Sequence, residues 1–165
     1  MEAYINKKCD KIITVSEKLK KYIIFEKKNK IDVVYNAFNK ADFNKEIKPR
    51  KNKRFSIFYM GSLYYERNPQ LIIKPLFKLL SLDISILQKI NLTIIGHNDI
   101  NLIKKEFKLL TDSGLNLELS SYVPHDTALI CAQQSDLLLL LIDDTYGSDA
   151  VVTGKLLEYI NMNVP

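Results

Sequence analysis

The sequence has few of the residues that build disulfide frameworks and metal centres. Its 165 residues include two cysteines and two histidines, and tryptophan is absent. Cys9 and Cys131 lie far apart and belong to no CxxC or Cys/His pattern of ligand spacing. The positions around His97 and His125 likewise lack the spacing of a metal site or a hydrolytic triad. We therefore expect two reduced thiols and no bound metal.

Long apolar runs are also missing. The longest, over residues 137–142, is far shorter than the roughly 20 residues that a membrane-spanning helix needs. The lysine-rich N-terminus has no apolar core of the kind found in signal peptides. These absences predict a cytoplasmic protein.

Two common nucleotide-binding fingerprints are absent as well. None of the five glycines belongs to a GxGxxG motif. The pair Gly154-Lys155 resembles the end of a P-loop, but GxxxxGK[ST] requires glycine at position 149 and Ser or Thr at position 156. The chain has Asp149 and Leu156 there, which excludes a Walker-type nucleoside triphosphatase.

Positive charge is concentrated in the first third of the chain. Residues 1–54 hold 16 Lys/Arg and 7 Asp/Glu, whereas residues 55–165 hold 8 and 12. Such a segment could face nucleic acid or an anionic membrane surface, but no aromatic interleaving or Arg-rich helix accompanies the lysines. We therefore predict solvated lysines and no nucleic-acid partner. Five basic residues over 48–54, together with Pro49, indicate a connector between domains.

Short apolar runs alternate with helical patterns, which is typical of a parallel sheet with helices on both faces. This predicts a doubly wound α/β fold. Pro75 is expected to kink or shorten its helix, and Pro69 to occupy the first helical position. The predicted strands are 11–16, 31–35, 55–60, 91–95, 117–121 and 137–142, and the predicted helices are 16–28, 68–80, 99–110, one from about 124, and 153–162.

In such folds ligands bind beyond the carboxyl ends of the strands. After the strand at 55–60, Gly61 permits a tight turn, and Arg67 and the following helix N-terminus can contact phosphate oxygens. Glu158, one turn into the last helix, can accept two hydroxyl hydrogen bonds from a ribose. The acidic residues at 143, 144 and 149 are interpreted as a solvated loop.

Six segments stand in a distinctive order: 9–17 (CDKIITVSE), 34–38 (VYNAF), 42–43 (DF), 59–63 (YMGSL), 94–96 (IIG) and 154–165, which begins GKLLEY. In this order and spacing the chain resembles a group 1 glycosyltransferase with the GT-B fold. The resemblance implies two Rossmann-like domains that face each other across a cleft, with a nucleoside diphosphate sugar held mainly by the C-terminal domain.

The resemblance also implies a division of the chain. Residues 1–36 correspond to the last strand-helix-strand unit of the acceptor domain, 37–54 to the interdomain connector, and 55–165 to a truncated nucleotide-sugar-binding domain. The fold is therefore expected to be incomplete at both ends.

The donor site follows by matching positions. Arg67 corresponds to the residue that contacts the pyrophosphate, Tyr122 and Val123 to the nucleobase contacts, and Glu158 to the ribose-binding carboxylate. Ala150 stands where relatives often carry an acidic residue. No catalytic residue, metal or cofactor is assigned. The donor-binding residues are predicted to be Gly61, Ser62, Arg67, Tyr122, Val123, Gly154, Lys155 and Glu158.

The activity implied is transfer of a sugar from a nucleoside diphosphate sugar to a saccharide or lipid-linked acceptor, in cell-envelope or capsule polysaccharide synthesis. A peripheral contact with the inner face of the membrane is a further expectation, as is inactivity of the isolated chain. Two alternatives stay open: a non-catalytic or degenerate domain used for nucleotide-sugar binding or interaction, and a sugar-nucleotide epimerase, which would carry carboxylate and histidine acid/base pairs.

Overall fold

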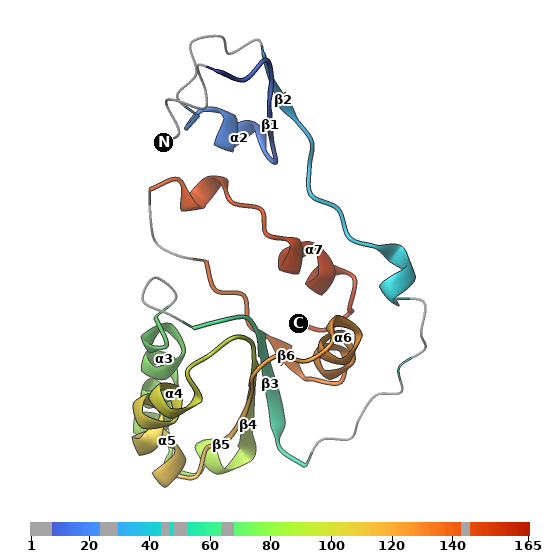
Figure 1. Ribbon diagram of the computed structural model, residues 1–165. Coiled ribbons are helices and arrows are strands. Elements are labelled where there is room, and N and C mark those ends of the chain that lie inside the picture. The colour runs from blue at the N-terminus through green and yellow to red at the C-terminus, as the bar shows by residue number, and fades with distance from the viewer. Residues whose placement is uncertain (1–7, 24–29, 44–46, 48–52, 64–67, 143–145) are drawn as a thin grey trace. The chain divides into compact units, whose positions relative to one another are not determined.

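The computed structural model describes residues 8–23, 30–43, 47, 53–63, 68–142 and 146–165 (Figure 1). The chain forms two compact units. The first contains Met1–Phe38 and Ile142–Glu158, and the second contains Asn39–Leu141 and Tyr159–Pro165.

In the first unit two short strands pair in parallel. β1 (Ile12–Thr14) and β2 (Ile31–Val33) align from Ile12 opposite Ile31 to Thr14 opposite Val33. The strand predicted over 31–35 therefore ends at Val33. The 3-10 helix η4 (Ser148–Ala150) and most of α7 (Gly154–Ile160) belong to the same unit.

Helix α2 (Glu17–Lys20) connects these strands and is shorter than predicted. Its start follows the sequence signal, because the Ser16 hydroxyl caps the helix by accepting the Leu19 N–H at 2.9 Å. The helix then tightens: the Lys21 N–H donates to the Lys18 carbonyl and the Tyr22 N–H to the Leu19 carbonyl. Such i to i+3 bonds are typical of a helix end, and residues 21–23 are not helical, so the predicted helix does not continue through them. Residues 24–28 of that prediction lie outside the described residues.

The second unit contains a four-stranded parallel sheet. Its strands are β3 (Phe55–Met60), β4 (Ile90–Ile95), β5 (Asn116–Ser120) and β6 (Leu137–Leu138), in the order β5-β4-β3-β6. The chain moves outward from β3 to β5 and then returns to the other side of β3. The order therefore reverses between β3 and β6, which is a topological switch point.

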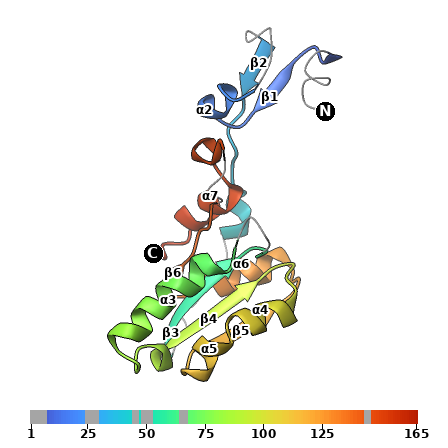
Figure 2. The same ribbon diagram turned by 90° about the vertical axis from the view of Figure 1, so that its left-hand side faces the viewer.

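Helices lie on both faces of this sheet, so the predicted doubly wound α/β fold is confirmed (Figure 2). The helical elements are η2 (Lys40–Phe43), α3 (Gln70–Leu82), η3 (Leu87–Lys89), α4 (Ile100–Glu106), α5 (Lys108–Asp112) and α6 (His125–Gln133).

Two of these helices differ from their prediction. α3 continues seven residues past Pro75, because Pro75 and Leu71 are both exposed and water can take the hydrogen bond that the proline ring removes. Pro69 stands at the N-cap position, one residue before the first helical residue, whereas the sequence predicted it one position later, inside the helix. The helix predicted over 99–110 is divided at Phe107, whose backbone has φ −87° and ψ 0°.

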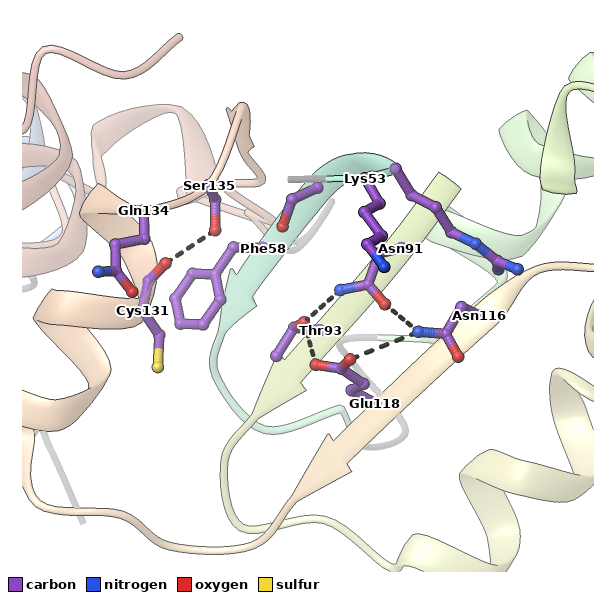
Figure 3. A pocket seen from close by; sticks show the side chains of 11 residues that line it. Lys53, Phe58, Asn91, Thr93, Asn116, Glu118, Cys131, Gln134 and Ser135 are labelled. Atoms are coloured by element: carbon purple, nitrogen blue, oxygen red, sulfur yellow. Dashed lines mark hydrogen bonds between the residues drawn. The ribbon is translucent and has the colours of Figure 1, made fainter. Parts of the chain in front are cut away.

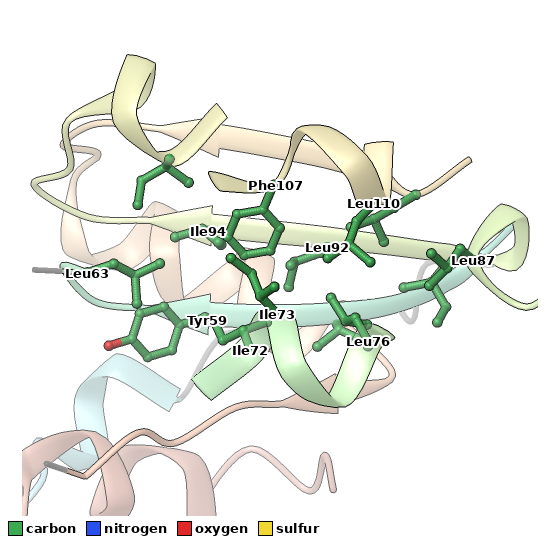
Figure 4. Close-up of a cluster of buried hydrophobic side chains, with 14 residues drawn as sticks. Tyr59, Leu63, Ile72, Ile73, Leu76, Leu87, Leu92, Ile94, Phe107 and Leu110 are labelled. Atoms are coloured by element: carbon green, nitrogen blue, oxygen red, sulfur yellow. The ribbon is translucent and has the colours of Figure 1, made fainter. Parts of the chain in front are cut away.

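The larger hydrophobic cluster lies between the sheet and helices α3, α4 and α5 (Figure 4). Alternate residues of β4 supply its floor, and Leu92 and Ile94 are fully buried. A second cluster lies on the other face, where Phe58 packs with Leu129 and Ala132 of α6 and with Tyr159.

The second face is not covered evenly. β4 and β5 carry polar residues there, and the register places Asn91 opposite Asn116 and Thr93 opposite Glu118. β5 therefore alternates between apolar and polar residues. The strand predicted over 137–142 is also reduced, because the sheet register with β3 covers only Leu137–Leu138.

Candidate functional site

The carboxyl ends of β3 and β4 continue their pairing for one residue into the following loops. The Gly61 N–H donates to the Ile95 carbonyl at 2.8 Å, and the Gly96 N–H donates to the Ser120 carbonyl at 3.2 Å. On β3 the Met60 N–H donates to the Tyr159 hydroxyl at 3.2 Å. The backbone at the switch point is thus held in place by hydrogen bonds.

Gly61 and Gly96 bring the two loops into direct backbone contact. A Cβ atom at position 96 would lie 2.3 Å from the Gly61 carbonyl oxygen and 2.9 Å from the Ser62 nitrogen. No side chain fits in that space, so the close approach requires glycine at position 96.

Asn98 joins the same two loops through its side chain. Its Oδ1 accepts the Leu63 N–H at 2.6 Å, and its Nδ2 lies 3.5 Å from the Gly61 carbonyl oxygen. Leu63 is buried in the larger cluster, so the loop is fixed at that residue by both packing and hydrogen bonding. Sequence reasoning missed Asn98, because its contacts reach 35 residues back along the chain.

The predicted site residues fall in both units. Gly61 is buried and Ser62 half-buried at the carboxyl end of β3, and Val123 packs against the second cluster after β5. Tyr122 is 78% exposed. Arg67 lies outside the described residues, as do the acidic residues at 143 and 144.

Helix α7 carries the remaining predicted residues. Gly154 begins the helix, and the Thr153 hydroxyl oxygen accepts the Leu156 N–H at 3.3 Å. Lys155 and Glu158 are three positions apart and therefore share one helix face, where both are half-buried.

Asp149 is exposed, which agrees with its interpretation as part of a solvated loop, and it is also ion-paired. Its Oδ2 lies 2.6 Å from the Lys18 ammonium, and its Oδ1 accepts the Tyr22 hydroxyl at 2.8 Å. The rings of Tyr22 and Tyr146 also form a T-shaped pair, with ring centroids 5.0 Å apart. At the residue after Asp149, the Ser16 hydroxyl donates to the Ala150 carbonyl at 2.9 Å. The η4 segment is thereby fastened to α2.

The Lys18 contact and the Tyr22 hydrogen bond hold the pKa of Asp149 below its ordinary range. A lowered folded-state pKa means that the contact stabilises the fold above the unfolded pKa, and that this contribution is lost as pH falls through the folded pKa. An NMR titration is expected to show that Lys18→Met raises the pKa of Asp149 more than Tyr22→Phe does, because Lys18 is the larger cause.

Asp83 is the control for this titration. Hydrogen bonds from Ser85 lower the pKa of Asp83 too, so Lys18→Met should leave it unchanged. An Asp149 pKa that does not move in Lys18→Met would contradict the ion pair.

A cavity of about 490 Å³ lies toward the amino ends of the strands, away from the loops described above (Figure 3). Its polar groups pair with one another: Asn91 donates to Thr93 at 3.2 Å, Thr93 to Glu118 at 3.1 Å, and Asn116 bonds to Asn91. Because ligands in parallel α/β sheets bind at the carboxyl ends of the strands, this cavity is not the candidate site.

Within the described ranges no three His, Cys, Asp or Glu side chains gather as a metal site requires. No helix in that part of the chain is long and apolar enough to cross a membrane. His97 and His125 are both exposed.

No protein-family model and no curated protein matches the sequence. Solved structures match its fold. WaaG, a glycosyltransferase involved in lipopolysaccharide biosynthesis, has a TM-score of 0.70 and 16% identity over 94% of this chain and 43% of its own. The chain has the GT-B glycosyltransferase fold. The predicted resemblance is therefore confirmed at the level of the fold.

Two TarM structures give the same result. A mutant of S. aureus TarM in complex with fondaparinux, alpha-GlcNAc-glycerol and UDP has a TM-score of 0.61 and 16% identity, over 83% of this chain and 27% of its own. Another TarM structure has a TM-score of 0.58 and 17% identity, over 83% and 26%. The chain thus spans less than half the length of these GT-B proteins.

Proposed function

We propose that this chain supplies the donor-binding part of a glycosyltransferase. The sugar would pass from a nucleoside diphosphate sugar to a saccharide or lipid-linked acceptor in cell-envelope or capsule polysaccharide synthesis. The observation that carries the proposal is the tightly held Gly61–Leu63 backbone at the β3/β6 switch point of a GT-B fold.

In glycosyl transfer the main role of the donor-binding residues is to stabilise the charge of the leaving group. As the bond between sugar and pyrophosphate breaks, negative charge grows on the leaving group, and donors fixed in advance stabilise it. We assign this role to the backbone at Ser62, to Arg67 on sequence grounds, and to Lys155. Glu158 would hold the ribose hydroxyls. No metal or cofactor is proposed, and the catalytic base is left unassigned.

The acceptor and the place of action rest on the neighbours. WaaG acts in lipopolysaccharide biosynthesis and TarM was crystallised with UDP, which favours an envelope polysaccharide and makes UDP the first ligand to test. A peripheral contact at the inner face of the membrane, in a cytoplasmic protein, completes the proposal.

A second candidate is nucleotide-sugar binding without transfer. Position 150 holds a buried alanine, and the neighbouring Asp149 carboxylate is engaged by Lys18 and Tyr22. Among the described residues of this loop, no acidic side chain therefore stands free at the position where relatives often carry one. An epimerase is less well supported, because both histidines are exposed.

Calorimetric titration with UDP, GDP and ADP tests the proposal. We expect one of them to bind, and Glu158→Ala and Arg67→Ala each to weaken it roughly tenfold or more, because each removes a charge-assisted hydrogen bond. Glu106→Ala is the matched control, since it removes an exposed carboxylate from the end of α4.

Two outcomes would overturn the donor site: that none of the three nucleotides binds, or that both substitutions leave the affinity unchanged. Sugar transfer is a separate readout. We expect none from the chain alone, and transfer to an added acceptor would contradict that expectation.

A further inference from the structure

Three consecutive amides follow the end of β3, and two of them already have acceptors within the protein. The Gly61 N–H donates to the Ile95 carbonyl at 2.8 Å, and the Leu63 N–H donates to Asn98 Oδ1 at 2.6 Å. Among the described residues, the Ser62 N–H between them donates to no protein group. It is the amide that remains for a ligand.

The orientation of this N–H follows from the peptide unit to which it belongs. The peptide between Gly61 and Ser62 is trans, so its carbonyl and its N–H point in opposite directions. The carbonyl oxygen lies 3.5 Å from Asn98 Nδ2, and the peptide unit as a whole packs against Gly96, since a Cβ there would lie within 2.9 Å of the carbonyl oxygen, its carbon and the Ser62 nitrogen. The Ser62 N–H therefore points away from the Asn98 side-chain nitrogen.

The loop lies at the carboxyl end of β3, beside the β3/β6 switch point, where a phosphate would be bound. We infer that Asn98 is a positioning residue, which fixes the Gly61–Leu63 backbone so that the Ser62 N–H faces the phosphates of the donor. The inference rests on the proposed function and adds to it a residue from a neighbouring loop.

The two contacts of Asn98 are not equal. The bond from the Leu63 N–H is short, whereas the contact with the Gly61 carbonyl is at the limit of a hydrogen bond. The acceptor role of Oδ1 thus carries most of the effect. Without it the Leu63 N–H is freed, the loop has two competing amides, and the peptide before Ser62 is no longer fixed.

The test compares UDP with uridine, which lacks the phosphates. Asn98→Ala is expected to weaken UDP binding about tenfold, a change that corresponds to one hydrogen bond, and to leave uridine binding unchanged. In NMR spectra, UDP should shift the Ser62 amide resonance in the parent chain and shift it much less in Asn98→Ala. Asn116→Ala, the same change at an exposed asparagine where β5 begins, should bind both ligands as the parent does.

The outcomes separate the inference from the proposal beneath it. If the parent binds UDP and Asn98→Ala binds it equally well, or loses UDP and uridine affinity to the same extent, the positioning role is wrong. If the parent binds no nucleoside diphosphate, the proposed function falls, and this inference falls with it.

Discussion

Replacing Gly96 with alanine is expected to lower the free energy of unfolding by about 3 kcal/mol or more. The added methyl group would lie 2.3 Å from the Gly61 carbonyl oxygen and 2.5 Å from its carbon, and both are backbone atoms. They cannot withdraw cheaply, because the Gly61 N–H is bonded to Ile95 and the Gly96 N–H to Ser120. Either β3 and β4 separate at their ends or the loop after β3 is displaced.

Gly154→Ala is the matched control, since apart from the adjoining residues and the backbone of its own helix no atom lies within 4 Å of a Cβ at that position. Gly154 begins α7, so alanine there should change stability by at most about 1 kcal/mol, and in the favourable direction. Urea denaturation followed by circular dichroism measures both variants. A Gly96→Ala chain as stable as Gly154→Ala would mean that the loops at Gly61 and Gly96 do not touch.

The sequence predicted the inner strands well, because their signal is local. β3 was predicted residue for residue over 55–60, since an apolar run lies there between a basic connector and a glycine. The five leucines after Asp136 were predicted as a longer strand than the structure has. Apolar character was a correct signal of burial there, but regular pairing ends at Leu138, and the chain passes into the other unit at Ile142.

Helix ends were harder to predict, because exposure and packing decide them. Pro75 was expected to disturb α3, but it lies on the exposed side, where its missing N–H has little consequence. The periodicity across 99–110 is continuous, yet the helix divides at Phe107. Hydrophobic spacing alone carries no sign of that division.

The candidate site could likewise be predicted only in part from the sequence. Gly61 and Ser62 could be placed at the sheet edge from the rule that ligands bind beyond the carboxyl ends of parallel strands. Asn98 and Asp149 could not be assigned their roles, because their contacts bridge 35 and 127 residues of sequence. A single sequence gives no spacing rule for such contacts.

Truncating Phe107 to alanine is the other large effect we expect, a loss of about 3–5 kcal/mol of folding stability. The ring is fully buried in the larger cluster, where it lies among Ile73, Leu92 and Ile94 (Figure 4). Its removal leaves a cavity between the sheet and the helices. Because small domains are stable by only about 5–15 kcal/mol, such a loss should bring unfolding to much lower urea concentrations.

Two further variants separate this packing effect from a change in the helix break. Leu109→Ala removes a side chain that is 66% exposed, two residues along the chain, and should cost no more than about 0.5 kcal/mol. Phe107→Leu refills most of the volume and should recover most of the lost stability. The backbone bonds from Phe107 N–H to Ile103 and from Leu110 N–H to Phe107 do not involve the ring, so all three variants retain them. If Phe107→Ala were no less stable than Leu109→Ala, the ring would not pack between the sheet and its helices, and the larger cluster would be wrongly placed.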